Sequence, residues 1–193
     1  MATERNEGQL IDWMTAYQSG DIEAFESLYK QLRPVLFHYL LYKTFDSSLS
    51  EDLLQESFLQ LHRSRRTYLP GKPVLPWALA IARNVFLMEG RSRRRRQKHE
   101  TAERPFLPEA ATTGQFDRIA EREDLRRAIA QLSPEQREIL LMHHAWGLSF
   151  AEIAGILGIL RTTAKLRSHR AIKALRTILG VSNVTKGLAE QIK

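Results

Sequence analysis

Residues 149–179 place the strongest constraint on how this chain can fold. The stretch reads SFAEIAGILGILRTTAKLRSHRAIKALRTIL. Ser149 followed three residues later by Glu152 is a capping box, which predicts that a helix begins here. The apolar side of that helix is formed by Ile153, Ala154 and Leu157. Gly158 can adopt the left-handed conformation that ends a helix, so the stretch predicts two helices joined by a glycine turn.

The second of these helices is strongly basic. Residues 161–176 carry six lysines or arginines and no acid. These cations are Arg161, Lys165, Arg167, Arg170, Lys173 and Arg176. A basic second helix after a glycine turn is typical of a helix-turn-helix motif that enters the major groove of DNA, with Ala154 where the helices cross. The alternative is a helical hairpin with a solvated basic face, which the absence of acid disfavours.

Helical periodicity also fills the rest of the 193 residues, and strand-like alternation is almost absent. We therefore expect an all-α protein of two small helical domains joined by a flexible linker. The first domain is placed at 1–98, the linker at 99–116, the second domain at 117–180 and a tail at 181–193. The linker HETAERPFLPEAATTGQF lacks periodicity and contains two prolines and one glycine.

Composition excludes several kinds of protein. There is no cysteine, so disulfides and thiolate zinc sites are excluded. No apolar run approaches the ~18 residues of a membrane span, and the polar N-terminus does not resemble a signal peptide. We expect a cytoplasmic protein, associated with the nucleoid when it works on DNA.

An enzyme is the weakest interpretation of this sequence. It shows no Ser/His/Asp set, no glycine-rich phosphate loop and no metal-spaced cluster, and no cofactor is expected. His143 and His144 are adjacent and point about 100° apart on a helix, so they are interpreted as surface and packing residues. Asp52 and Glu56 lie one turn apart, but no third ligand for a cation is in view.

The net charge of +7 is unevenly distributed along the chain. Residues 1–60 carry −6, residues 61–104 carry +9, residues 105–138 carry −2 and residues 139–193 carry +6. The two basic blocks suggest two nucleic-acid contacts. The acidic block at residues 1–60, called the acidic front below, suggests a different partner.

The predicted helices of the first domain begin with one marked by Leu10, Trp13, Met14 and Tyr17. Asp21 can cap the next helix, which Pro34 should kink or restart. Asp46-Ser-Ser is interpreted as a loop, and Ser50 as the cap of a third helix. The residues of that helix expected to face inward are Leu53, Leu54, Phe58 and Leu61.

A proline-rich loop, TYLPGKPVLP, follows the third helix, and Pro76-Trp77 is predicted to open a long fourth helix. Six of the eight residues from Arg91 to Lys98 are basic and continue that helix. After the linker, a helix opened by Asp117 carries Ile119, Leu125, Ile129 and Leu132. Ser133-Pro134-Glu135-Gln136 combines a capping box with proline at the first helical position.

Four stretches, in this order and spacing, resemble bacterial sigma factors of the extracytoplasmic-function (ECF) group, which have only a σ2 and a σ4 domain. They are DIEAFESLYKQLRPVL, SEDLLQESFLQLHRSR, TYLPGKPVLPWALAIARN with its arginine run, and LSPEQREILLMHHAWGLSFAEIAGILG. The resemblance covers about residues 10–179. It implies a non-enzymatic factor that directs core RNA polymerase to specific promoters and starts transcription.

The resemblance also implies partners and site residues. The σ2 domain would bind the clamp helices of the largest polymerase subunit through Asp52, Gln55 and Glu56. It would melt the −10 element and capture a base through Tyr68, Lys72, Trp77, Arg83, Asn84, Arg91 and Arg94. The σ4 domain would bind the flap of the second-largest subunit and read the −35 duplex. A dedicated anti-sigma factor would restrain the protein.

The predicted −35 contacts are Arg161, Lys165, His169 and Arg170. The first three follow one another at four-residue spacing, and Lys165 is placed mid-face as the base reader. Ala164 and Leu175 are expected to face the domain core. The rival interpretation is a stand-alone helix-turn-helix regulator, which leaves the acidic front and the proline-rich loop without a role.

The chain departs from the family pattern at several positions. Leu160 replaces the expected helix cap, which is worth ~1 kcal/mol. Leu166 stands where a small polar residue often faces DNA, and Ser168 where an apolar residue packs inward. Met88-Glu89-Gly90 replaces an acid and an aromatic residue.

Overall fold

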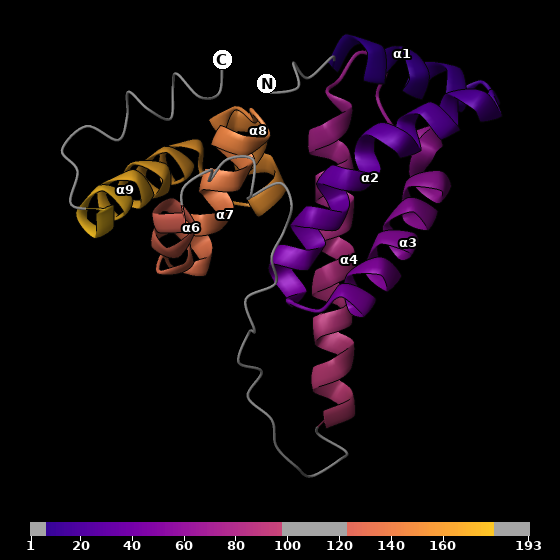
Figure 1. Ribbon diagram of the computed structural model, residues 1–193. Coiled ribbons are helices and arrows are strands. Elements are labelled where there is room, and N and C mark those ends of the chain that lie inside the picture. The colour runs from indigo at the N-terminus through magenta and orange to yellow at the C-terminus, as the bar shows by residue number, and fades with distance from the viewer. Residues whose placement is uncertain (1–6, 98–122, 180–193) are drawn as a thin grey trace. The chain divides into compact units, whose positions relative to one another are not determined.

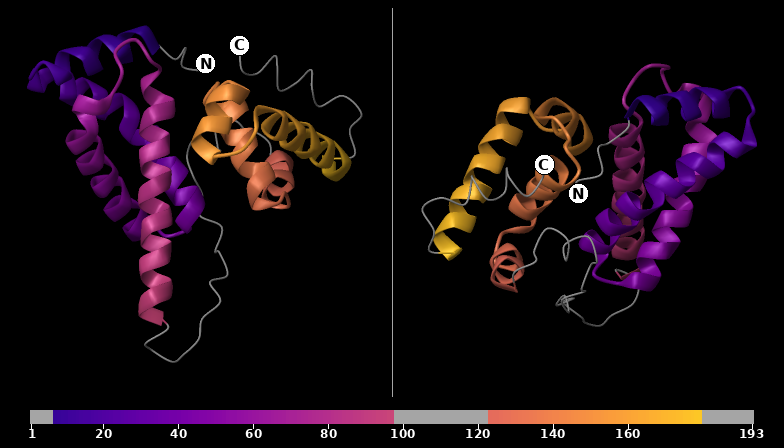
Figure 2. Two further views of the ribbon diagram at one scale, coloured as in Figure 1. Left: turned by 180° about the vertical axis from the view of Figure 1, so that it is seen from behind. Right: turned by 45° about the horizontal axis from the view of Figure 1, so that its top comes forward.

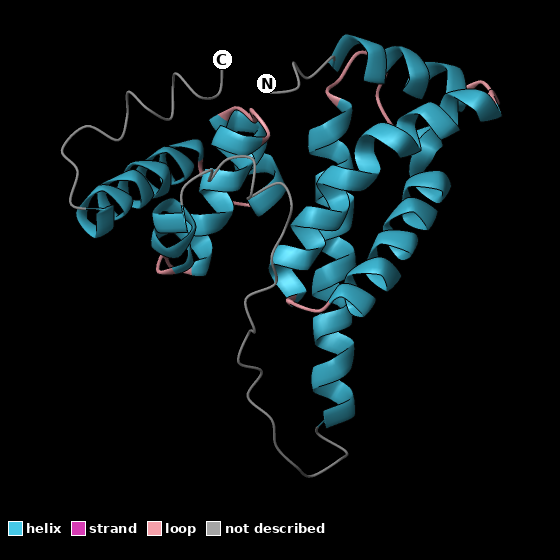
Figure 3. Cartoon of the chain, viewed as in Figure 1, coloured by secondary structure: helices cyan, strands magenta, loops and turns pink. Residues whose placement is uncertain are grey.

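The computed structural model describes residues 7–97 and 123–179, and all the secondary structure in these ranges is helical (Figures 1 and 3). The described residues form two compact units, one on either side of the gap. The predicted all-α class with two helical regions is therefore confirmed. The linker predicted at 99–116 and the tail at 181–193 lie outside the described residues.

The first unit contains α1 (Glu7–Gln18), α2 (Ile22–Thr44), α3 (Ser47–Ser64), the 3₁₀ turn η1 (Arg65–Thr67) and α4 (Val74–Gln97). In Figures 1 and 2, α1 lies across one end of the bundle that α2, α3 and α4 form. Large side chains from all four helices are fully buried between them. They include Met14, Leu28, Leu32, Leu36, Tyr39, Leu40, Leu54, Leu61 and Leu79. Each such side chain contributes about 1.5–3 kcal/mol of transfer free energy.

The second helix begins where the sequence predicted and runs past Pro34 without a break. The Asp21 carboxylate accepts hydrogen bonds from the amides of Glu23 and Ala24 at 2.9 and 3.2 Å. The helix then continues through Pro34 to Thr44, so of the two predicted effects of Pro34, a kink or a restart, the restart is excluded. Burial of α2 side chains on both sides of Pro34 holds this helix in place.

The third helix begins earlier than predicted. Asp46 is its N-cap and accepts a hydrogen bond from the Leu49 amide at 3.0 Å, so the Asp46-Ser-Ser loop and the Ser50 cap are both wrong. Ser50 lies inside the helix and is fully buried. Its hydroxyl donates to the Asp46 carbonyl at 2.6 Å and lies 2.7 Å from the Thr44 hydroxyl, which satisfies its polar group.

The fourth helix also begins earlier, at Val74 instead of Pro76. The Glu7 carboxylate accepts hydrogen bonds from the amides of Val74 and Leu75. These are among the first amides of a helix, which have no partner within it. The cap therefore comes from α1, 67 residues away in the sequence.

The second unit contains α6 (Glu123–Ala130), α7 (Pro134–Leu140), η2 (Leu141–Ala145), α8 (Phe150–Leu157) and α9 (Arg161–Leu179). Both predicted capping boxes are present, at Ser133 and at Ser149. Gly158 ends α8 with φ 67°, in the left-handed region where glycine carries no steric cost. Of the apolar residues predicted for α6, Ile119 lies outside the described residues.

The turn η2 is π-helical and joins α7 to α8. Its mark is the hydrogen bond from the Trp146 amide to the Leu141 carbonyl, five residues back, at 3.0 Å. The Leu148 amide then donates to the Met142 carbonyl at 2.9 Å. None of the helices described in either unit is long and apolar enough to cross a membrane.

The corrected cap of α3 gives a stability prediction. Asp46→Ala removes the acceptor of the Leu49 amide and should lower the free energy of unfolding of the first unit by about 1 kcal/mol. Ser48→Ala, an exposed change in the same helical turn, is the matched control and should alter it by less than about 0.5 kcal/mol. Urea denaturation of the full chain measures both, and equal effects would contradict the assignment.

Candidate nucleic-acid interface

The basic helix α9 buries one stripe and exposes the opposite one. The buried stripe consists of Ala164, Ser168, Ala171 and Leu175, each at most 3 % exposed. These four residues are spaced by four, three and four positions. The residues two positions before each of them form a second stripe: Thr162, Leu166, His169 and Lys173. A displacement of two residues turns a helix by about 200°, so this second stripe faces solvent.

The four predicted −35 residues are all exposed on α9. Lys165 is one residue, or about 100°, from the buried stripe, so it lies on a flank of the exposed face. It remains the middle residue of the predicted row Arg161, Lys165, His169, whereas Leu166, 48 % exposed, lies directly opposite the buried stripe. The expected inward positions of Ala164 and Leu175 are confirmed.

The structure shows whether the residues that depart from the family pattern are buried or exposed. Ser168 is buried where an apolar residue was expected, and Leu160 is 73 % exposed immediately before α9. The exposed face of α9 thus combines cations with the apolar side chain of Leu166. Cations suit phosphates and guanine, and an apolar side chain suits the methyl group of thymine.

In the first unit, the predicted −10 loop is a closed structure, with Leu69-Pro70-Gly71-Lys72 forming a tight turn. The Lys72 amide donates to the Leu69 carbonyl at 3.1 Å, and Gly71 has φ 80°. Proline followed by glycine at positive φ is the pattern of a type II turn. The tip is exposed, with Leu69 at 65 %.

Tyr68 lies beneath this turn instead of on its surface. It is 3 % exposed, its hydroxyl donates to the Lys72 carbonyl, and its ring centroid lies 5.2 Å from that of Trp77. Burial raises the pKa of the Tyr68 hydroxyl, and the nearby Glu7 carboxylate raises it further. Tyr68 therefore supports the loop from inside, whereas Lys72 is exposed at its end.

The remaining predicted −10 residues lie on α4. Trp77, Asn84 and Arg91 recur every seven residues and share one face of the helix. The face runs from the loop toward the arginine run, and Asn84 and Arg91 on it are exposed. Arg83 is about 100° away and half-buried. The side chain of Arg94 lies outside the described residues.

The predicted polymerase contacts lie on α3. Asp52 and Gln55 are exposed, and Asp52 has no ion-pair partner within the described residues. Glu56 is half-buried; it accepts a hydrogen bond from the Gln60 amide group at 2.6 Å and lies 3.8 Å from Arg63. Asp52 is thus the carboxylate most available to a basic partner.

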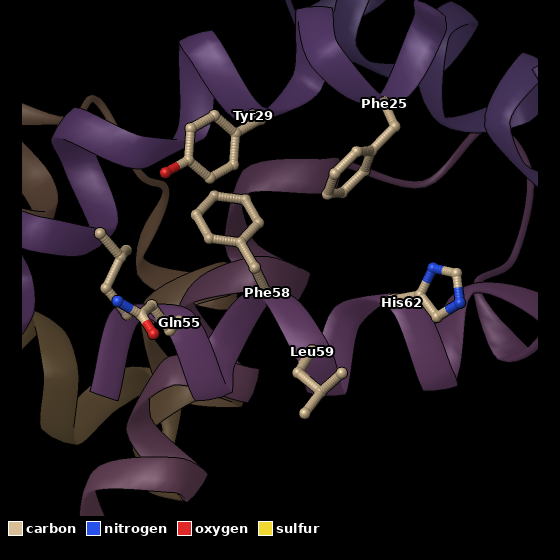
Figure 4. A pocket seen from close by; sticks show the side chains of 7 residues that line it. Phe25, Tyr29, Gln55, Phe58, Leu59 and His62 are labelled. Carbon is tan, nitrogen blue, oxygen red and sulfur yellow. The ribbon is translucent and has the colours of Figure 1, made fainter. Parts of the chain in front are cut away.

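An apolar pocket opens beside these residues, between α2 and α3 (Figure 4). It has a volume of about 330 Å³, and its lining consists of Phe25, Tyr29, Leu54, Gln55, Phe58, Leu59 and His62. Figure 4 shows Phe58 of α3 beneath Tyr29 of α2, with ring centroids 4.5 Å apart. Tyr29 and Leu59 are 37 % and 43 % exposed at its rim. The sequence analysis did not predict this pocket, because an aromatic residue at helical spacing fits a core position as well as a pocket wall.

The rings of the two adjacent histidines contact each other edge to face, with centroids 4.8 Å apart. His143 Nδ1 lies 2.7 Å from the Leu148 carbonyl oxygen. The His143 ring also stacks on the Phe150 ring, with centroids 4.2 Å apart. Burial lowers the pKa of His144, and the neighbouring His143 lowers it further. Among the described residues, no three His, Cys, Asp or Glu side chains gather as a metal site would require.

Comparisons with known proteins identify two regions of the chain. Residues 28–96 match the family model "Sigma-70 region 2", and residues 122–175 match "Sigma-70, region 4". The chain is 34 % identical over 167 residues to RNA polymerase sigma factor CarQ of Myxococcus xanthus, covering 86 % of this chain and 95 % of that protein. It is 33 % identical over 161 residues to ECF RNA polymerase sigma factor SigL of Mycobacterium tuberculosis, covering 83 % and 91 %.

Two solved structures share the fold. One is the sigma factor RpoE in complex with the anti-sigma factor NepR from Bartonella quintana, with a TM-score of 0.63, 23 % identity, and coverage of 84 % of this chain and 100 % of that one. The other is CnrH in complex with the cytosolic domain of CnrY, with a TM-score of 0.62, 18 % identity, and coverage of 91 % and 99 %. Because the two region models together cover more than half of the chain and CarQ matches along almost its whole length, this protein belongs to the ECF RNA polymerase sigma factors, non-enzymatic proteins with sigma-70 regions 2 and 4 that direct RNA polymerase to promoters.

Proposed function

We propose that the two units divide promoter recognition between them. The second unit, a σ4 domain, reads the −35 element as duplex through α9. The first unit, a σ2 domain, captures an unpaired base of the −10 element with the 68–73 loop and the Trp77–Asn84–Arg91 face of α4. The observation that carries the proposal is the exposed face of α9, where cations and no acid lie opposite a buried stripe.

The first unit also binds core polymerase in this proposal, through α3. Asp52 supplies charge for a basic surface, and the pocket beside Gln55 accepts an apolar side chain. The target is the clamp helices of the largest subunit, while the second unit binds the flap of the second-largest. Apolar anchors surrounded by polar contacts are the usual composition of a protein interface.

An anti-sigma factor is the second proposed partner. RpoE and CnrH, which share the fold, were each solved with a protein bound, NepR and the cytosolic domain of CnrY. The exposed apolar rim of the α2–α3 pocket supports a similar partner here, one that would compete with polymerase. Promoter binding by the pure chain, without core polymerase, would favour the stand-alone regulator instead.

The polymerase contact is tested by reversing the free acid of α3. Asp52→Arg should weaken binding to core polymerase roughly tenfold, since a repulsive pair replaces an attractive one. Asp52→Arg combined with Glu56→Arg should abolish co-purification. The matched control is Glu26→Arg, which reverses an exposed acid on α2 and should bind as the wild type. Pull-down with purified core measures all three, and equal retention of Asp52→Arg would overturn the contact.

Strand opening is tested at Asn84. Asn84→Ala should reduce promoter opening about tenfold, because the exposed amide no longer bonds an unpaired base. Binding to a −35 duplex fragment provides the internal control and should not change. Permanganate reactivity of the −10 thymines measures opening; wild-type reactivity in the variant would exclude Asn84 from base capture.

The −35 assignment is tested by comparing two lysines of α9. Lys165→Ala should flatten discrimination at one or two −35 positions, at a cost of ~1–3 kcal/mol on the preferred sequence. Lys173→Ala, eight residues further along, should weaken all sequences alike and lower the salt slope by about one. Binding of holoenzyme to a panel of −35 variants separates the two. Uniform weakening by Lys165→Ala would make Lys165 a phosphate contact.

A further inference from the structure

The helix α1 holds both ends of the 68–73 loop. At the first end, the Gln18 side-chain amide donates to the Arg65 carbonyl at 2.7 Å and to the Tyr68 carbonyl at 2.9 Å. Both hydrogens of this amide group are thus used on backbone 47 and 50 residues away. At the other end, the Glu7 carboxylate caps the first amides of α4.

A second contact at the first end reinforces the Gln18 bonds. The Tyr17 hydroxyl is hydrogen-bonded to His62 Nδ1, and Arg65 donates to His62 Nε2 at 3.1 Å. Because arginine can only donate, neutral His62 must accept at Nε2 and carry its proton on Nδ1, where it donates to Tyr17. The Arg65 guanidinium also lies 5.8 Å from the centre of the Tyr17 ring.

Because both contacts come from one helix, α1 fixes the distance between the two ends of the 68–73 loop. Glu7 and Gln18 are eleven residues apart on one helix, roughly 16 Å along its axis at 1.5 Å per residue. A helix of this length does not stretch, so the two ends of the loop keep a set separation. Between them, the type II turn and the bond from Tyr68 to the Lys72 carbonyl fix the interior.

We propose that α1 holds the 68–73 loop ready for base capture, with Gln18 and Glu7 as positioning residues for strand opening. The inference rests on the proposed role of this loop at the −10 element. The match to sigma-70 region 2 begins at residue 28, so α1 lies outside it. A loop already ordered before DNA arrives loses less conformational entropy when it traps a base.

The test uses holoenzyme made with the full chain and measures closed-complex binding and opening separately. Gln18→Leu keeps the size of the side chain but removes both donors. It should slow opening about tenfold, measured by 2-aminopurine fluorescence in the −10 element, and leave closed-complex affinity within about twofold. Glu7→Ala should act in the same direction from the other end. Glu7→Gln retains an acceptor oxygen and should restore most of the opening rate.

Two controls separate positioning from general stability. Asp12→Asn removes an exposed acid from the same helix and should open promoters as the wild type does. Pro70→Gly loosens the loop itself, so adding Gln18→Leu to it should cost less than Gln18→Leu costs alone, because both changes act on one property.

The outcomes distinguish this inference from the function on which it rests. Wild-type holoenzyme that fails to open a −10 element would overturn the proposed function. If the wild-type holoenzyme opens the promoter and the Gln18→Leu holoenzyme opens it equally fast, the inference alone is overturned. A parallel loss of closed-complex binding and opening, or additive costs with Pro70→Gly, would also overturn it, since α1 would then only stabilise the unit.

Discussion

The helices proposed to meet DNA and polymerase, α9, α4 and α3, each bury one side and expose the other. On α9 three of the four side chains of the buried stripe are small, with Ala164, Ser168 and Ala171 at most 3 % exposed. Small residues let the helix pack closely, so its rotation about its own axis is tightly determined. That rotation decides which side chains can reach DNA. It places Leu166 at the centre of the exposed face and Lys165 on its flank.

The same constraint separates the two kinds of partner chemistry. The basic and polar groups assigned to DNA lie on α9, on α4 and in the 68–73 loop, whereas the free acid lies on α3 and the apolar pocket lies between α2 and α3. Exposed charges interact over about 8 Å at physiological salt, so closely mixed signs would weaken attraction to either partner. In the proposed function, each partner therefore meets a surface suited to its own charge, and the contacts need not compete within one patch.

Sequence patterns predicted the features that depend on neighbours three or four residues apart. The capping boxes at Ser133 and Ser149 and the glycine stop at Gly158 are of this kind, and all three are present. The start of α4 was wrong because its cap, Glu7, comes from another helix. The start of α3 was wrong because Asp46 and Ser50 can both cap, and only the packed structure shows Ser50 buried.

The candidate sites were also predicted only where they depend on local sequence, not where they depend on contacts between helices. Exposure of the predicted α9 residues follows from one helical period, but the central position of Leu166 required the buried stripe to be known. The role of Gln18 had no sequence signal, since its two acceptors are backbone carbonyls. The pocket beside Gln55 was also missed, because periodicity shows that an aromatic residue is apolar, not whether a neighbouring helix covers it.

The π-helical turn η2 has a further consequence, for the register between α7 and α8. A π turn accommodates one residue more than an α-helix of the same length. That extra residue rotates the next part of the chain by about 100°, and His143 thereby reaches both the Leu148 carbonyl and the Phe150 ring. The turn thus adds a one-residue spacer between α7 and the short connection that leads to α8. Shortening this segment by one residue would re-aim the helix-turn-helix while leaving its sequence intact.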